Sequence, residues 1–291
     1  MVLKIDSHHH LWDLEQNSRE WLKSDGLQKI NRTFLFRDFL IAQAKLGIDY
    51  SILVQTIPDY AELDEFFQIA NAEQKIAGVV SWIDISDSNA FAQLDLAMDK
   101  HQFKKLVGIR DGAQGRSDKD WLSSAPVISG VQKLGERELV FDLLISPENL
   151  KAAEILVRAC PETIFVLDHV AKPNIALQLF EPWSTDLEGL AKLPNVYCKV
   201  SGMITESNWG EWKANDFDLY FARVHEVFGS DRIMFGSDWP VCLLAGSYEA
   251  VFSLAANFIS KLSIHEQELF WSGNAIKAYN LKLERGAHEQ L

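Results

Sequence analysis

Two histidines near the start of the chain, His8 and His10, are the first residues whose type and spacing could do chemistry. They end a largely apolar run that begins at Val2. In a β-strand, side chains two residues apart point the same way, so His8 and His10 share one face and His9 points to the other. Two imidazoles side by side at a strand end can bind a metal ion or transfer protons. A tag remnant or a solvated strand end is the alternative, although a tag is usually longer and lacks the apolar run.

Polar side chains also interrupt or end several later apolar runs of strand length. They are Arg110 and Asp111, Asp142, Asp168 and His169, Lys199 and Ser201, and Ser237 and Asp238. A polar group inside an apolar run costs free energy unless it is paired or faces a functional cavity. The ends of these runs are therefore the candidate site positions.

The apolar runs alternate with stretches of helical periodicity. They cover residues 2–6, 51–56, 76–83, 106–110, 139–145, 163–169, 196–202 and 232–238. Near-continuous apolar runs are typical of parallel strands buried on both faces. Eight of them alternating with helices predict an α/β fold, a single (β/α)8 TIM barrel over residues 1–291, with the active site at the C-terminal ends of the strands. Long polar loops at 13–33, 112–119 and 203–215 are expected to cover one end of the barrel.

Composition narrows the class of protein. The formal charge of −13 argues against a nucleic-acid or anionic-membrane partner, because either needs a basic surface. The sequence has no 18-residue apolar stretch and no cationic leader pattern at its start. Its three cysteines are widely spaced and lack a CxxC motif, which is typical of reduced thiols. These features predict a cytoplasmic enzyme and make no prediction of oligomeric state.

Three motifs give the chain a specific resemblance to a known family. They are Asp6-x-His8-x-His10, Asp168-His169-x-x-Lys172-Pro173 and the segment Phe-Gly-Ser-Asp-Trp-Pro at 235–240. In this order and spacing they resemble the amidohydrolase superfamily, and within it the sugar-lactonase branch of amidohydrolase family 2, of the L-fuconolactonase type. The resemblance extends from residue 5 to about residue 242. It implies a (β/α)8 barrel and hydrolysis by an activated water.

The resemblance also implies roles for individual residues. It places His8, His10, His169 and Asp238 as metal ligands, with Asp238 also accepting the proton of the attacking water. His169 or Arg110 would stabilise the oxyanion that forms at the carbonyl. Asp238 could instead cap a loop, His169 could be a structural buried histidine, and Arg110 could pair with a neighbouring carboxylate.

The resemblance leads us to expect at most one bound metal ion. Arg110 and Asp111 stand where binuclear relatives bridge two metals, and Asp142 stands where mononuclear relatives often supply a histidine. One divalent ion is expected, with zinc the favoured metal. Because some members of the branch work without a tightly held ion, this ion is expected to be weakly bound or dispensable.

Three further residues are candidates for substrate binding. A buried Asp142 could accept hydrogen bonds from sugar hydroxyls. Lys172 could contact the substrate or, like Lys199, form a salt bridge on the barrel rim. Trp239 could stack on a sugar ring, although filling the barrel mouth is the favoured role for its indole.

The expected substrate is a small neutral molecule. A ring dicarboxylate would require several arginines at the barrel mouth, and the chain offers only Arg110 and Arg116 near these strand ends. A hydroxyl-rich sugar aldonolactone of the L-fucono-, D-galactono- or L-rhamnono- type is therefore the favoured substrate. The alternatives are a metal-dependent decarboxylase of the same superfamily and a non-catalytic barrel that binds a sugar acid.

Overall fold

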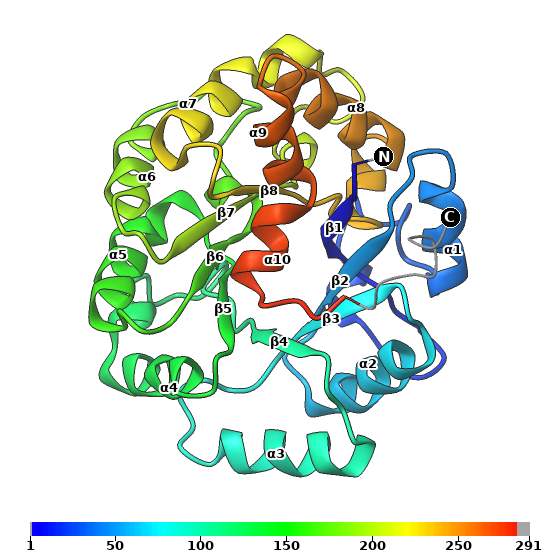
Figure 1. Cartoon of the computed structure of the whole chain (residues 1–291), viewed down its shortest axis with the longest axis vertical. Helices are drawn as coiled ribbons and strands as arrows, with labels where there is room; N and C mark the ends of the chain where they lie inside the picture. Colours follow the sequence, from blue (N-terminus) through cyan, green and yellow to red (C-terminus); the bar gives the residue numbers. More distant parts are fainter. Residues whose placement is uncertain (1, 284–291) are drawn as a thin grey trace.

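An eight-stranded parallel sheet forms the centre of the computed structural model, which describes residues 2–283. The strands are β1 (Ile5–His9), β2 (Tyr50–Val54), β3 (Ile76–Ser81), β4 (Leu106–Ile109), β5 (Val140–Leu143), β6 (Phe165–Leu167), β7 (Val196–Val200) and β8 (Ile233–Phe235). Each strand pairs in parallel with the next one along the chain. A parallel bridge between His9 and Trp239 brings β1 beside the segment after β8, so the sheet forms a nearly closed barrel (Figure 1). The predicted (β/α)8 barrel is confirmed.

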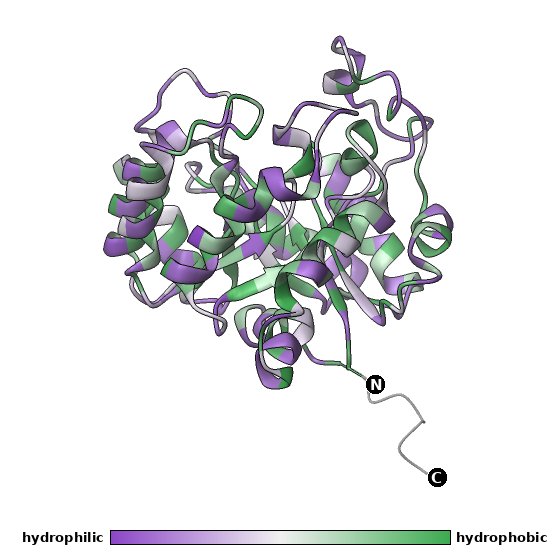
Figure 2. Ribbon diagram, turned by 90° about the horizontal axis from the view of Figure 1, so that it is seen from above, coloured by the Kyte–Doolittle hydropathy of each residue, from purple (hydrophilic) through white to green (hydrophobic). Residues whose placement is uncertain are grey.

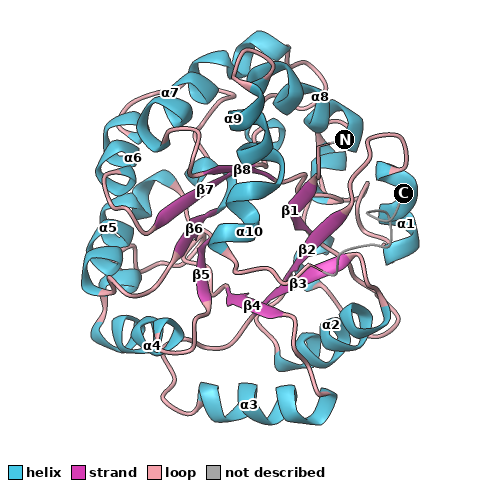
Figure 3. Ribbon diagram, in the orientation of Figure 1, coloured by secondary structure: helices cyan, strands magenta, loops and turns pink. Residues whose placement is uncertain are grey.

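A ring of helices surrounds the strands (Figure 3). They are α1 (Phe36–Gln43), α2 (Tyr60–Ala72), α3 (Ala90–His101), α4 (Ala125–Gly135), α5 (Leu150–Ala159), α6 (Trp183–Ala191), α7 (Asp218–Phe228) and α8 (Tyr248–Ile259). The apolar stripes of these helices pack on the outer face of the sheet and form one continuous core with it. The strand residues that point inward form a second cluster inside the barrel. Because the strands are covered on both faces, they read as continuous apolar runs in the sequence.

Periodicity in the sequence predicts one helix over residues 121–134 and one over residues 264–279, and the structure divides both. Residues 121–134 form a short 3₁₀ turn, Trp121–Ser123, before α4 begins. Pro126 lies in the first turn of α4 and has no N–H to donate, so a helix cannot continue through it from the preceding turn. The last stretch comprises α9 (Ile264–Glu268), a π-helical turn and α10 (Asn274–Ala278).

The segment of α10 closes one end of the barrel. Ala275, Tyr279 and Leu281 pack in the interior cluster with residues of the strands, among them Ile5 and Met234. Figure 1 shows α10 in front of the barrel centre, and Figure 2 shows long loops projecting from the opposite end. These loops follow the C-terminal ends of the strands, where the fold places its chemistry. Within residues 2–283, no helix is both long and apolar enough to cross a membrane.

Close packing between α4 and the loop after β3 gives a test of the fold. A Cβ added at Gly130 of α4 would lie 1.9 Å from the backbone oxygen of Ile85, which cannot move away cheaply. We expect Gly130→Ala to lower the free energy of unfolding by about 1–3 kcal/mol, as overpacking does. Urea unfolding followed by circular dichroism measures the change.

Gly189→Ala in α6 is the matched control. Its added Cβ would meet only the carboxylate end of the Glu154 side chain, which can rotate away. Alanine should then raise helix stability by up to about 1 kcal/mol. Equal effects of the two substitutions would contradict the packing described here.

Candidate active site

The side chains of β1 alternate as the period of a strand requires. The Nε2 atoms of His8 and His10 lie 3.2 Å apart, and both side chains are buried. His9 points the other way and stacks on Phe39 of α1, with 4.1 Å between the ring centroids. His8 and His10 therefore share one face, whereas His9 belongs to the packing between strand and helix.

Asp6 joins the end of β1 to the end of β8. Its Oδ1 accepts hydrogen bonds from the N–H groups of His8, at 3.1 Å, and Ser237, at 2.9 Å. Its Oδ2 accepts a hydrogen bond from the Tyr248 hydroxyl at 2.8 Å. Burial raises the pKa of Asp6 to about 6, although these hydrogen bonds oppose the rise. No role is predicted for Asp6 from the sequence, although its position two residues before His8 in the first motif is a signal for one.

Asp238 follows β8 and faces three imidazoles. Its φ of 56° turns the chain, and its N–H donates to the carbonyl oxygen of His8 at 2.8 Å. Its Oδ1 lies 3.3 Å from Nε2 of His10 and 3.9 Å from Nε2 of both His8 and His169. Burial alone would raise the pKa of Asp238, but the neighbouring imidazoles, His169 foremost, outweigh burial and lower it. Asp238 is therefore a carboxylate at neutral pH.

His169 occupies a left-handed turn of the backbone. Residues 169–172 all have positive φ, between 48° and 60°, a conformation that costs roughly 1–2 kcal/mol per residue outside glycine. The Trp183 indole supports the turn by donating to the carbonyl oxygen of Val170 at 2.8 Å. Gly202 leaves room for the His169 ring, because a Cβ there would lie 2.6 Å from His169 Nδ1. That Nδ1 lies 2.9 Å from Ser201 Oγ, which can accept or donate, so both tautomers of the ring fit.

Burial also decides the charge of the His169 ring. Removal from water lowers its pKa to about 4, although the nearby carboxylates of Asp238 and Asp168 act in the opposite direction. The ring is therefore neutral at neutral pH. A neutral ring can serve as a metal ligand through a nitrogen lone pair or as a hydrogen-bond donor through its N–H.

A buried network of charges lies beside the histidines. Arg110 Nη1 donates to Asp168 Oδ2 at 2.9 Å, and Lys199 Nζ lies 3.0 Å from Asp168 Oδ1. Lys199 also donates to Asp142 Oδ2 at 2.5 Å, and the Tyr279 hydroxyl donates to Asp142 at 2.8 Å. Two cations thus balance two carboxylates, as buried charges require.

Burial and the neighbouring charges shift the pKa values of Asp142 and Asp168 in opposite directions. Burial raises the pKa of Asp142 to about 6 against the opposing effect of Lys199. Burial would also raise the pKa of Asp168, but Lys199, His8 and Arg110 hold it well below its usual range. Asp168 is therefore the firmly ionised member of the network.

The position of Lys199 corrects a prediction. Lys199 is predicted from the sequence to form a salt bridge on the barrel rim, whereas its side chain is fully buried inside the barrel. Its position within the apolar run of β7 indicates the buried location, because a charged side chain there requires buried partners. The hydrogen bond of the Tyr279 hydroxyl to Asp142 could not be found in this way, because the two residues lie 137 positions apart in the sequence.

The three candidate substrate-binding residues lie in different surroundings. Asp142 is buried in the charge network described above. Lys172 Nζ donates to Glu206 Oε1 at 2.9 Å and is partly buried. Trp239 is buried and packs edge-on against Phe34, with 5.2 Å between ring centroids. A role in substrate binding stays a prediction for all three residues.

The residues around Asp238 fit a single divalent ion. Ligand atoms of His8, His10 and Asp238 lie within 4.8 Å of one another, as do those of His8, Asp168 and His169. His10 Nδ1 lies 2.7 Å from the carbonyl oxygen of Val54, which can only accept, so a neutral His10 carries its proton on Nδ1. Its Nε2 lone pair then faces the Asp238 carboxylate, an arrangement that favours a cation between them. Imidazole and carboxylate ligands suit zinc, and a hydrogen-bonded second nitrogen is typical of zinc-binding histidines.

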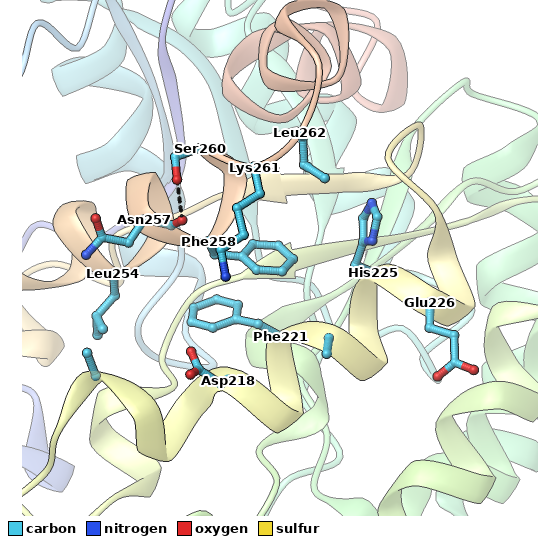
Figure 4. Close-up of a pocket in the computed structure, with 12 residues that line it drawn as sticks. Asp218, Phe221, His225, Glu226, Leu254, Asn257, Phe258, Ser260, Lys261 and Leu262 are labelled. Carbon is cyan, nitrogen blue, oxygen red and sulfur yellow. Dashed lines mark hydrogen bonds between the residues drawn. The ribbon is translucent and has the colours of Figure 1, made fainter.

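A separate cavity of about 690 Å³ lies on the outside of the barrel, between α7 and α8 (Figure 4). Its lining combines the stacked rings of Phe221 and Phe258 with His225 and Lys261. None of the strand-end residues described above contributes to it. The chemistry of the strand ends is therefore not connected to this cavity.

Comparison with known proteins agrees with the motifs and the fold. The amidohydrolase family profile matches residues 5–281. The L-fucono-1,5-lactonase of Burkholderia multivorans is 33% identical over 294 residues, which cover 96% of this chain and 97% of that protein. The L-fucono-1,5-lactonase of Burkholderia ambifaria is 32% identical over 249 residues, covering 85% of this chain and 84% of that protein.

A solved structure is similar in fold as well as in sequence. It is the crystal structure of an amidohydrolase from Burkholderia multivorans with bound zinc. The two chains superpose with a TM-score of 0.88 at 32% identity, over 96% of this chain and all of the other. Family profile, relatives and structure agree, and the predicted resemblance and hydrolase class are confirmed: the chain belongs to the amidohydrolase family.

Proposed function

We propose that this protein hydrolyses the ring ester of a sugar aldonolactone. The observation that carries the proposal is the carboxylate of Asp238, ionised and within 3.3–3.9 Å of nitrogens on three buried histidines. A carboxylate in this position can accept a proton from water, and neutral imidazoles beside it can bind a metal ion or donate hydrogen bonds. The L-fucono-1,5-lactonase names of two relatives at 32–33% identity support the same reaction.

The proposed reaction uses Asp238 as the general base. A water oxygen attacks the carbonyl carbon while its proton passes to the Asp238 carboxylate. The carbon–oxygen bond of the ring then breaks, and the same proton passes to the ring oxygen as it leaves. The product is an open hydroxy acid, which releases one proton to solution at neutral pH.

We assign the oxyanion to His169 and a supporting role to Arg110. The Arg110 Nη2 atom donates to the backbone and side-chain oxygens of Gln55, and its Nη1 atom donates to Asp168. These contacts engage both terminal nitrogens of Arg110, whereas its buried Nε–H has no hydrogen-bond partner among the described residues. The His169 ring lies beside Asp238, where its Nε2–H can donate to the developing oxyanion.

We further propose that His8, His10 and Asp238 hold one divalent ion, with zinc the favoured metal. When bound, such an ion polarises the carbonyl or lowers the pKa of the attacking water. The bound zinc in the Burkholderia multivorans amidohydrolase supports this assignment.

The paired cations at the strand ends favour a neutral substrate. Arg110 is neutralised by Asp168 at 2.9 Å, and Arg116 by Asp111 at 2.7 Å. Lys172 is paired with Glu206 at 2.9 Å. A substrate carboxylate would have to displace one of these internal partners, whereas sugar hydroxyls need only hydrogen bonds. We therefore propose an L-fucono-, D-galactono- or L-rhamnonolactone rather than a charged ring.

Proton release across a panel of aldonolactones and simple aromatic lactones tests the proposed function. We expect one sugar lactone to be opened at least tenfold faster than its epimers, because hydroxyls that meet a fixed site distinguish stereoisomers. A pH indicator at neutral pH measures the rate. Acid release no faster than the spontaneous rate for every lactone would contradict the proposal, and carbon dioxide release from a ring carboxylate would favour a decarboxylase.

Zinc content tests the assigned ligands. We expect the double variant His8→Ala, His10→Ala to lose stoichiometric zinc, because it removes two of the three ligands at once. His9→Phe is the matched control: the ring that it replaces stacks on Phe39, away from the site, so zinc should be retained. Metal analysis after equilibration with zinc and gel filtration measures both. Equal zinc in the double variant and the control would place the ligands elsewhere.

A further inference from the structure

The inner nitrogen of His8 has both a hydrogen-bond acceptor and a hydrogen-bond donor within reach. His8 Nδ1 lies 3.2 Å from Asp168 Oδ1 and 3.3 Å from Lys199 Nζ. The side chains of His8, Asp168 and Lys199 are all fully buried. Water cannot readily replace either partner, so the hydrogen bond at this nitrogen is determined by the protein alone.

Without a metal ion, the contacts favour a proton on the outer nitrogen of His8. Because the Val54 carbonyl accepts from His10 Nδ1 at 2.7 Å, a neutral His10 can only accept at Nε2. His8 Nε2, 3.2 Å away, then donates to it, and His8 Nδ1 accepts from Lys199. Arg110 Nη1 lies 3.4 Å from the same His8 Nε2, but its shorter contact is the 2.9 Å bond to Asp168. In this tautomer, His8 Nε2 has no lone pair to offer a cation.

The opposite tautomer has a carboxylate within reach. Asp168 Oδ1 lies 3.2 Å from His8 Nδ1 and accepts no hydrogen bond from the described residues, so a proton on Nδ1 can be donated to it after a small rotation of the His8 ring. The Nε2 lone pair then faces His10 and Asp238. Lys199 remains bound to Asp142 and Asp168, so no buried charge loses its partner. This is the tautomer that a metal ligand requires, with the second nitrogen hydrogen-bonded to a carboxylate.

We propose that Lys199 and Asp168 hold His8 in one tautomer when no ion is bound and in the other when an ion is bound. The site can then take up or release a divalent ion with only a small rotation of the His8 ring. The imidazole stays neutral throughout: one proton leaves Nε2 and one binds Nδ1, by exchange with water, so His8 itself releases no net proton. The inference rests on the metal site of the proposed function and explains how an ion could be weakly held there.

Lys199 is thus a positioning residue. A column of buried contacts, from Tyr279 through Asp142 to Lys199, fixes its position. The Tyr279 hydroxyl, from the segment after α10, donates to both oxygens of Asp142, at 2.8 and 2.9 Å. Asp142 in turn accepts from Lys199. The ammonium group is therefore held between two carboxylates and cannot follow the His8 ring.

Nitrogen NMR of the histidine side chains tests the proposal directly. Long-range ¹H–¹⁵N spectra of histidine-labelled protein distinguish the two tautomers, and the His8 signals are identified by their loss in His8→Gln. We expect an Nε2 proton on His8 in chelator-treated protein and an Nδ1 proton after addition of zinc. The same tautomer in both states, or no response of His8 to zinc, would overturn the proposal.

Two variants separate the effect of Lys199 from general disturbance of the network. Lys199→Met removes the donor to His8 Nδ1, so the metal-free protein should now carry the His8 proton on Nδ1. Tyr279→Phe perturbs the same column one contact further away and should leave the wild-type change of tautomer intact. An Nε2 proton in metal-free Lys199→Met would contradict the role of Lys199. If that variant does not fold, the wild-type spectra still decide.

These spectra require no substrate. Failure of the tautomer change therefore leaves lactone hydrolysis to be judged by proton release alone, and absence of lactone turnover leaves the tautomer result standing.

Discussion

The hydrogen bonds of Asp6 join the two ends of the barrel, and the candidate site depends on that closure. One oxygen of Asp6 accepts from the backbone of β1 at His8 and from the backbone after β8 at Ser237. The bridge between His9 and Trp239 and the bond from the Asp238 N–H to the His8 carbonyl oxygen complete the same closure. In an open sheet, His8 and Asp238 would lie at opposite edges. In the closed barrel, a carboxylate from the last strand lies beside the imidazoles of the first. Closure of the sheet thus positions the Asp238 carboxylate beside the imidazoles of β1.

Burial and charge pairing determine which side chains inside the barrel are neutral and which are ionised. His169 is kept neutral by removal from water, while Asp238 and Asp168 are kept ionised by the groups around them. The same burial would be destabilising for an unpaired Lys199, which is why the chain surrounds it with two carboxylates. An ionised carboxylate, a neutral imidazole and a fixed cation therefore coexist within a few ångströms.

The barrel and the central part of the site could be predicted because they rest on local patterns. Strand alternation alone separates His8 and His10 from His9, and the fold places the ends of all eight strands at one mouth. The pairing of Asp142 with Lys199 and Tyr279 could not be predicted, because it depends on which inward-facing side chains meet across the barrel. The left-handed turn at 169–172 is likewise held by distant contacts, such as the Trp183 indole, rather than by any residue preference within it.

The most direct test of the account is the turnover of Asp238→Asn on the best sugar lactone. Asparagine keeps the size of the side chain but is a far weaker proton acceptor, so the rate should fall by roughly 10²–10⁴-fold, the usual contribution of a general base. Unchanged circular dichroism and melting temperature would show that the fold is intact. A variant that folds and retains the wild-type rate would contradict the role of Asp238 and, with it, the chemical interpretation of the site.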